Sequence, residues 1–289
     1  MQKPNICSTL MVLIACHSLH SQVIITPGID TSRISQLLAQ PGFQFSNFEI
    51  TGDSLAYGEF LGQSEIPLTH GLILGTGKVS ESAGPNLIQN TGHCYGTLDT
   101  VAGFNLFAPY ATKDVCTISF DFVSVTNAAE FIYSFASEEY PEYVYSQYND
   151  VFAIFINGPN PSGGTYINRN IAKTPGGSHI GVNTINSNDN RNLYYDNNMP
   201  AGHHIIYDGL TDYLTSAIEV IPGQIYHITF AIADADDCNF DSAVFIASTD
   251  SEKHDLPNLP SYGVSCFPNP VVTELRWLAA AGTTVDEVS

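Results

Sequence analysis

Short stretches in which apolar and polar residues alternate are the feature of this sequence that most restricts its fold. The clearest runs cover residues 43–50, 115–123, 151–156 and 225–231. Because successive side chains of a β-strand point to opposite faces, a period of two predicts strands with one face in a core. Clusters of Gly, Pro and Asn separate the runs. The pattern predicts an all-β fold, an antiparallel, jelly-roll-like β-sandwich over residues 22–250.

One segment has a different period. Residues 31–40 place Ile34, Leu37 and Leu38 at helical spacing, and Pro41 follows them. This spacing predicts one short N-terminal helix.

The core of the sandwich should contain the large apolar side chains at alternating positions of the strongest runs. These residues are Phe120, Phe122, Phe131, Phe135, Phe152, Ile154, Phe230, Val244 and Phe245.

The charge balance excludes some classes of protein. The chain has 9 Lys and Arg against 29 Asp and Glu, a formal charge of −20. Neutralising nucleic-acid phosphates requires clustered Lys and Arg, so we expect no nucleic-acid partner. After the N-terminal segment no apolar stretch is long enough for a membrane span, and we expect none.

The N-terminus is typical of a secretory signal peptide. Lys3 precedes an apolar run over residues 10–15, and the small residue Ser21 stands at the expected cleavage site. We therefore expect residues 1–21 to be removed on export. In the alternative interpretation the residues before Cys16 form a lipobox, and Cys16 carries a lipid anchor.

The cysteines that remain after export are Cys94, Cys116, Cys238 and Cys266. An even number in an exported protein indicates disulfides. We expect Cys94 to pair with Cys116, because the two close a short loop. Alternatively Cys116 is a small core residue on the face that it shares with Ile118.

An acidic string suggests a calcium site. Asp234, Asp236, Asp237 and Asp241 lie between two apolar runs, and we expect the string to turn a hairpin that gathers the carboxylates. Ca²⁺ accepts six to eight oxygen ligands in irregular geometry. Asp150 or Asp208 would add a ligand from a neighbouring loop. The alternative is a solvated acidic turn held by backbone hydrogen bonds.

A tyrosine-rich stretch is the candidate ligand-binding surface. Its residues are Glu138, Glu139, Tyr140, Glu142 and Tyr143. Tyrosine offers a rigid apolar face and a hydroxyl, which suits binding of an extracellular glycan or protein. No catalytic motif is present, so we expect a non-enzymatic binding or adhesion module. The alternative is a secreted hydrolase that cleaves glycans with two of these carboxylates.

Several longer strings carry a resemblance to a known family. They are ISQLL at 34–38, GLILGTG at 71–77, FDF at 120–122, SFASEEY at 134–140, QYNDVF at 147–152, NTIN at 183–186, YDG at 207–209 and DSAVF at 241–245. In this series the chain closely resembles the bacterial choice-of-anchor L domain family over residues 23–250. The resemblance implies a β-sandwich in exported proteins that carry interchangeable anchors. Relatives often have cysteines where this chain has Pro141 and Tyr145, so no disulfide pairing is transferred.

The C-terminal part resembles a second export element. Residues 251–262 form a Pro-containing linker, and the string CFPNP at 266–270 resembles the opening of a type IX secretion sorting domain. Only 19 residues follow Pro270, so we expect residues 263–289 to be a truncated sorting domain or, alternatively, one with a divergent tail. The resemblance implies that the partners include export machinery and that the protein is secreted or held at the outer cell surface.

Overall fold

A computed structural model describes residues 23–97, 101–104, 111–198 and 201–249. The expected signal peptide, linker and sorting domain lie outside the described residues, as do Cys16 and Cys266. No described helix has the length and apolar character needed to cross a membrane.

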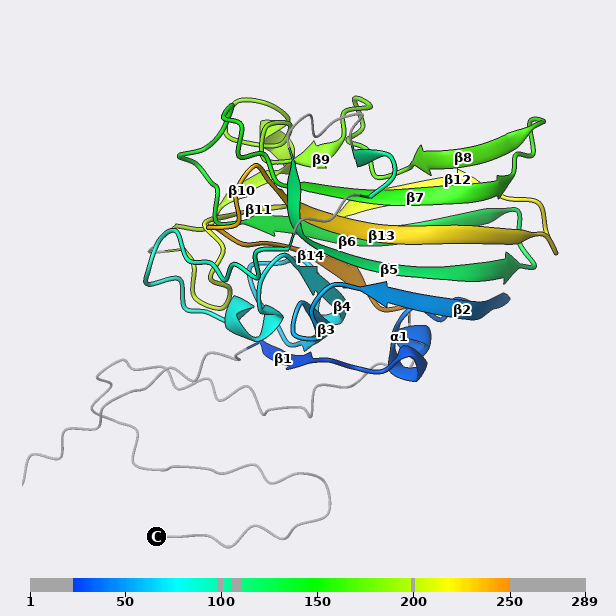
Figure 1. The fold of residues 1–289 in the computed structure, drawn as a ribbon, viewed down its shortest axis with the longest axis horizontal. Helices are drawn as coiled ribbons and strands as arrows, with labels where there is room; N and C mark the ends of the chain where they lie inside the picture. The colour runs from blue at the N-terminus through cyan, green and yellow to red at the C-terminus, as the bar shows by residue number, and fades with distance from the viewer. Residues whose placement is uncertain (1–22, 98–100, 105–110, 199–200, 250–289) are drawn as a thin grey trace, which may run out of the picture. The chain divides into compact units, whose positions relative to one another are not determined.

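Two antiparallel sheets pack face to face in the described chain (Figure 1). The eight-stranded sheet has the order β1 (Ile24–Pro27), β3 (Tyr57–Leu61), β4 (His70–Gly75), β14 (Ser242–Ala247), β6 (Ala128–Ser137), β11 (Gly209–Thr211), β10 (Tyr194–Asp196), with β12 (Leu214–Glu219) also paired to β6. The six-stranded sheet has the order β2 (Phe43–Thr51), β5 (Thr112–Ser124), β13 (Ile225–Ala235), β7 (Val151–Pro159), β8 (Thr165–Asn170), with β9 (Ile180–Gly181) also paired to β7. The predicted β-sandwich is confirmed.

The predicted helix is confirmed as α1 (Thr31–Leu37). The side chain of Asp30 accepts a hydrogen bond from the Arg33 backbone N–H at 2.8 Å and so caps the helix. Ile34 and Leu37 are fully buried against the sandwich core. The helix ends earlier than predicted: Leu38 is its C-cap, and the Ala39 N–H donates to the Gln36 carbonyl in a tighter turn. Two short 3₁₀ turns, η1 (Val79–Ser82) and η3 (Arg191–Leu193), lie in the connections.

Aromatic side chains from both sheets meet in the core between them. Phe131 of β6 packs edge-on against Phe230 of β13, with ring centroids 5.2 Å apart. Eight of the nine predicted core residues lie in this layer. Phe245 is the exception: it is buried, but on the outer face of its sheet, where its ring meets Phe60 at 5.2 Å. Since Val244 already faces the core, alternation turns Phe245 to the other side.

Further apolar layers cover the outer faces of both sheets. On the eight-stranded sheet, Ile205 and Tyr207 from a connection join Phe245 in a second cluster. On the six-stranded sheet, Phe104 covers Phe155 of β7, with ring centroids 5.8 Å apart. The central strands are therefore buried on both faces for much of their length.

The predicted pairing of Cys94 with Cys116 is wrong, because Cys94 forms a disulfide with Cys238, 144 residues away in sequence. Cys116 is fully buried in the layer between the sheets, beside Ile118. Alternation along β5 directs Cys116 into this layer, so it cannot reach a loop outside the strand. Burial raises the pKa of the Cys116 thiol to about 12.

Candidate functional site

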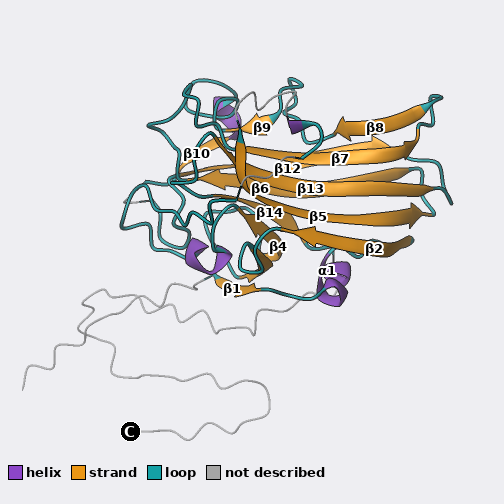
Figure 2. Ribbon diagram, in the orientation of Figure 1, coloured by secondary structure: helices purple, strands orange, loops and turns teal. Residues whose placement is uncertain are grey.

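Seven buried carboxylates gather at one end of the sandwich, on the left in Figure 1, where Figure 2 shows many of the loops. Strands β5, β7, β11 and β14 begin there, and β6 and β13 end there. Each carboxylate lies at or next to one of these strand ends. We call this region the acidic end; its carboxylates belong to Asp114, Glu138, Glu139, Asp150, Asp208, Asp234 and Asp241.

These seven side chains are at most 5% exposed. In the described part of the chain none of them forms an ion pair with Lys, Arg or His. Burial without a positive partner disfavours the charged form of a carboxyl group. Burial accordingly raises the pKa of Glu138 to about 8 and that of Glu139 to about 9, and neighbouring carboxylates add to both shifts.

Three of the seven fasten the loop over residues 91–97 to the sandwich. Alternate residues of this loop donate hydrogen bonds to Glu138, Asp241 and Asp114. The bonds are Thr91 Oγ1 to Glu138 Oε1 (2.8 Å), His93 N to Asp241 Oδ1 (2.8 Å), Tyr95 N to Asp114 Oδ2 (2.7 Å) and Thr97 N to Asp114 Oδ1 (2.8 Å). These carboxylates therefore have a structural role whatever else they bind.

Asp150 and Asp234 form the centre of the acidic end. Ala233 of β13 pairs with Val151 of β7, so the next residues along, Asp234 and Asp150, lie near each other. Asp150 accepts hydrogen bonds from Ala235 N at 3.1 Å and from Ser242 Oγ at 2.6 Å. Asp234 is different, because both of its carboxylate oxygens are buried and neither has a partner within hydrogen-bonding distance. The Thr76 side chain lies near enough only to oppose the rise in its pKa.

The pKa values of Asp150 and Asp234 agree with their buried positions. Burial raises the pKa of Asp150 to about 7. Burial and the Asp150 charge raise the pKa of Asp234 well above its usual value. A buried acceptor group without a donor is costly, and two like charges across a strand pair repel. The pair is therefore expected to hold a proton or a cation.

Glu139 contributes a third acceptor to this centre. Its Oε2 atom is buried without a partner. The charges of Asp150 and Asp237 raise its pKa after burial, which places these groups close to Glu139. From sequence alone, Glu139 is predicted as a ligand-binding residue and not as a metal ligand.

The predicted hairpin between Asp234 and Asp241 is wrong. β13 belongs to the six-stranded sheet and β14 to the eight-stranded sheet, so residues 236–241 cross from one sheet to the other. Each strand already pairs on both sides with other strands. The crossing nevertheless brings Asp234 and Asp241 to the same end, and the Asp241 charge contributes to the raised pKa of Asp234.

Of the other predicted metal ligands, Asp237 is near enough for its charge to act on Glu139 and Asp150, but Asp236, Asp237 and Asp208 all have other hydrogen-bond partners. Asp236 is half-buried and accepts a hydrogen bond from the Gln147 amide. Asp237 is half-buried and accepts from Asn239, both from its backbone N–H at 3.2 Å and from its amide at 2.9 Å. Asp208 lies at another part of the acidic end, beside Asn86.

No three carboxylates converge tightly among the described residues. The one group of three possible metal ligands whose atoms lie within 4.8 Å of one another is Cys94, Asp114 and Cys238. The two sulfurs of this group form the disulfide, so they are not thiolate ligands. A cation at the acidic end would need water, or a small approach of the carboxylates, to complete its coordination.

The predicted ligand surface is only partly exposed. Glu138, Glu139 and Tyr140 are buried, and the Tyr140 hydroxyl donates to the Ile185 carbonyl at 2.6 Å. Glu142 is exposed. Tyr143 is half-buried, and its ring packs against those of Tyr148 and Phe240 at 5.5 and 5.4 Å. A large ligand at this surface would meet Glu142 and the edge of Tyr143.

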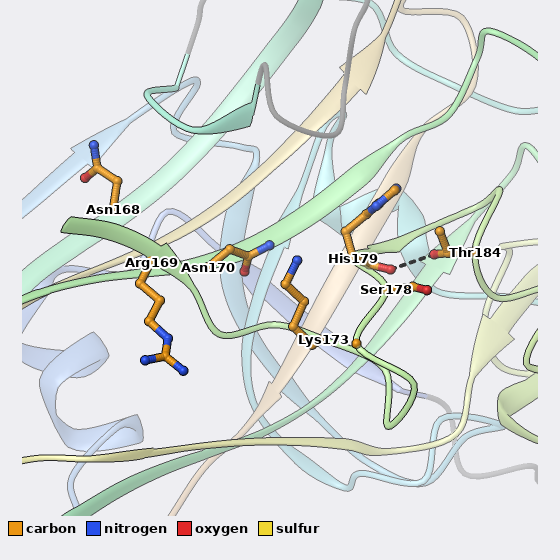
Figure 3. A pocket seen from close by; sticks show the side chains of 8 residues that line it. Asn168, Arg169, Asn170, Lys173, Ser178, His179 and Thr184 are labelled. Atoms are coloured by element: carbon orange, nitrogen blue, oxygen red, sulfur yellow. Dashed lines mark hydrogen bonds between the residues drawn. The ribbon is translucent and has the colours of Figure 1, made fainter. Parts of the chain in front are cut away.

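A second candidate site, missed by the sequence analysis, is a groove of about 450 Å³ beside β8 and β9 (Figure 3). We call it the donor-lined groove. No carboxylate is among its lining residues, which are Asn168, Arg169, Asn170, Lys173, Gly177, Ser178, His179 and Thr184. The Arg169 guanidinium and the Lys173 ammonium extend in different directions in Figure 3. No local motif marks these residues, because the chain only brings them together through its turns.

Asn170 shows what the groove offers to a ligand. Its Oδ1 accepts from Ile154 N at 3.3 Å and from Ala172 N at 2.9 Å, which fixes the orientation of the amide. Its Nδ2 donor is then buried without an acceptor. Burial lowers the pKa of Lys173, and burial together with Lys173 lowers that of His179. The groove therefore favours a ligand with acceptor or negatively charged groups.

A search of curated proteins and a search of solved structures both find no match. A family model does match residues 29–251, which include every strand from β2 to β14 and the whole acidic end. The chain therefore belongs to the choice-of-anchor L domain family, whose members are associated with the cell surface or the extracellular space.

Proposed function

We propose that the protein is a non-enzymatic, extracellular binding module whose acidic end holds a Ca²⁺ ion. The observation that carries this proposal is Asp234, a fully buried carboxylate whose oxygens have no partner within hydrogen-bonding distance, next to a second buried carboxylate, Asp150.

The donor set favours a hard cation. The unsatisfied atoms around Asp234 are carboxylate oxygens, including Oε2 of Glu139. Oxygen ligands suit Ca²⁺ and Mg²⁺, and Ca²⁺ tolerates irregular geometry and bound water better. Extracellular calcium modules typically bind in the range of about 10⁻⁴–10⁻³ M, so a loosely formed site is sufficient.

The ion would make the binding surface rigid. It would join β13, through Asp234, to β7, through Asp150, and to the end of β6, through Glu139. The crossing over residues 236–241 follows Asp234 directly and carries Phe240, which packs against Tyr143. Calcium at this point would therefore order the exposed surface that contains Glu142, and a pre-ordered surface binds its ligand at lower entropic cost.

Thermal unfolding with calcium and with chelator tests this proposal. Free Ca²⁺ at 100 times its Kd should add about 2.7 kcal/mol to the stability of the parent protein. Asp234→Asn should remove the gain that comes from this site. Asp212→Asn, at an exposed position, is the matched control and should keep it. Equal melting temperatures of the parent with and without the ion would exclude calcium.

We propose further that a separate ligand, an anionic glycan or polymer, binds in the donor-lined groove. Lys173, Arg169 and the orphan Nδ2 donor of Asn170 support this, because positive and donor groups are scarce in a chain of charge −20. Arrays of sulfated, carboxylated and neutral glycans test the assignment. Lys173→Gln should weaken binding to acidic glycans about tenfold, while Lys78→Gln, whose ion pair with Glu81 lies elsewhere, should not. A preference for neutral glycans, unaffected by Lys173→Gln, would contradict it.

The alternative function, a secreted glycan hydrolase, is less well supported. A pair of acidic residues must reach the scissile bond. Glu138 and Glu139 are buried, and Glu138 already accepts a hydrogen bond from Thr91. Release of new reducing ends from a glycan panel, lost in Glu138→Gln or Glu139→Gln, would favour the hydrolase.

The proposed export route has its own test. A cleaved signal peptide predicts that the protein isolated from its cells begins at Gln22, and a type IX sorting segment predicts that deleting residues 263–289 prevents display at the surface. A diacylated Cys16 at the N-terminus would establish a lipoprotein instead.

A further inference from the structure

Asp208 has a separate group of neighbours at the acidic end. It is fully buried and precedes β11 directly. Its Oδ1 accepts from the Asn86 amide at 2.8 Å, and its Oδ2 is buried without a partner. Burial raises its pKa, and the charges of Glu142 and Asp196 add to the shift. The charges that act on Asp234 are different ones, those of Asp150, Asp241 and Asp114.

Asn197 lies opposite Asp208. The pairing of β10 with β11 matches Asp196 with Gly209, so the next pair is Asn197 with Asp208. A hydrogen bond from Asn197 N to the Asp208 carbonyl, 2.9 Å long, confirms this register. Side chains of directly opposed residues lie on the same face, with Cβ atoms about 5 Å apart.

The Asn197 amide is held in one orientation. Its Nδ2 donates to the carbonyls of Ile205 at 3.1 Å and Tyr207 at 2.8 Å. Its Oδ1 is therefore the free end, and it is buried without a donor. Asn197 itself is fully buried.

Asn90 adds a third oxygen. The backbone N–H of Asn90 lies near the Asp208 carboxylate and opposes the rise in the pKa of Asp208. The loop that contains Asn90 therefore passes close to Asp208. The Oδ1 of Asn90 is also buried without a partner. Three segments of the chain thus meet around Asp208, and each brings a buried side-chain oxygen that has no hydrogen-bond partner.

We propose that Asp208 Oδ2, Asn197 Oδ1 and Asn90 Oδ1 form a second divalent-cation site, suited to Ca²⁺ and independent of the site at Asp234. If Asp208 were protonated, its O–H could donate a hydrogen bond to one of the two asparagine oxygens. The other asparagine oxygen would remain without a donor. A cation satisfies all three oxygens together, and one carboxylate with two amide oxygens is a ligand set that Ca²⁺ accepts. The ion would fasten the loop at Asn90 and the end of β10 to the start of β11.

Native mass spectrometry with Ca²⁺ tests the proposal by stoichiometry. The parent protein should bind two ions, Asp208→Asn one, Asp234→Asn one, and the double variant none. Asp212→Asn is the matched control and should bind two. If Asp208→Asn loses an ion and Asp234→Asn does not, the result supports the site at Asp208 and overturns the site at Asp234.

A milder variant covers the case in which Asp208→Asn does not fold. Asn90→Ala removes one ligand from a partly exposed loop and should weaken the second Kd about tenfold. Ion binding that is unchanged from the parent in both Asp208→Asn and Asn90→Ala would overturn the proposal.

Discussion

Cys94 and Cys238 form a disulfide that joins the loop over residues 91–97 to the crossing between the two sheets. The same loop donates hydrogen bonds to Glu138, Asp241 and Asp114. The loop is therefore held both by a disulfide and by hydrogen bonds to buried carboxylates. We expect the structure of the acidic end to depend on both.

The first prediction concerns this disulfide. Replacing both Cys94 and Cys238 by Ser should destabilise the protein by about 2–5 kcal/mol, near the upper end because the closed loop is long. Urea unfolding measures the change. Alkylation without reductant should label Cys116 only after unfolding, since its side chain is fully buried. A cross-linked peptide containing Cys94 and Cys116 would contradict the pairing.

The second prediction concerns the core. Phe152 is fully buried, and its ring packs against Tyr133 with centroids 5.1 Å apart. Phe152→Ala should cost about 3–5 kcal/mol, because it leaves a cavity between the sheets. Ile167→Ala, at a position that is 77% exposed, is the control and should change stability by less than about 0.5 kcal/mol. Equal urea midpoints for the two variants would show that Phe152 is not a core residue.

Alternation predicted the fold class because one face of each strand must leave water. It did not predict which sheet a strand joins, since sheet partners are chosen by tertiary packing that no local pattern records. The hairpin expected between Asp234 and Asp241 failed for this reason. Strands that are also covered on their outer face carry apolar residues on both faces, so alternation does not show which face points into the central core. For this reason the sequence assigns Phe245 to the wrong layer.

The candidate site was predictable where its residues are close in sequence. The acidic string pointed to Asp234 and Asp241, and both lie at the acidic end. Asn197 and Asn90 were missed, because an asparagine reads as a turn residue until its neighbours are known. Lys173 was missed as well, since single basic residues carry no spacing signal.

The third prediction uses Glu59. Arg33 donates to it at 2.6 and 2.9 Å, and His70 lies 2.8 Å away. The Arg33 hydrogen bonds, helped by His70, lower the pKa of Glu59 from 4.5 to about 2. A lowered pKa stabilises the fold above pH 4.5 and loses this contribution as the pH falls towards 2.

Urea unfolding between pH 5 and pH 2 measures this loss. Glu59→Gln should be less stable than the parent at pH 5 and should lose less stability on acidification. Glu49→Gln, at an exposed position, should follow the parent. The stability that the Arg33–Glu59 ion pair contributes at pH 5 should be modest, because both side chains are partly exposed to solvent. Parallel curves for the parent and Glu59→Gln would show that Glu59 does not contribute.

The last prediction concerns the pH dependence of the cation-free protein. Burial raises the pKa of Glu138 from 4.5 to about 8, and that of Asp241 from 3.8 to about 7. Here the folded state binds protons more tightly than the unfolded state. Stability is therefore greatest below the unfolded pKa values and falls as the pH rises through the folded ones. In chelator, the urea midpoint should decrease from pH 5 to pH 8.5. Glu138→Gln, neutral and nearly isosteric, should flatten part of this decrease, whereas Glu49→Gln should leave it unchanged. A midpoint that rises over the same range would mean that Glu138 and Asp241 are ionised in the folded protein without a cation.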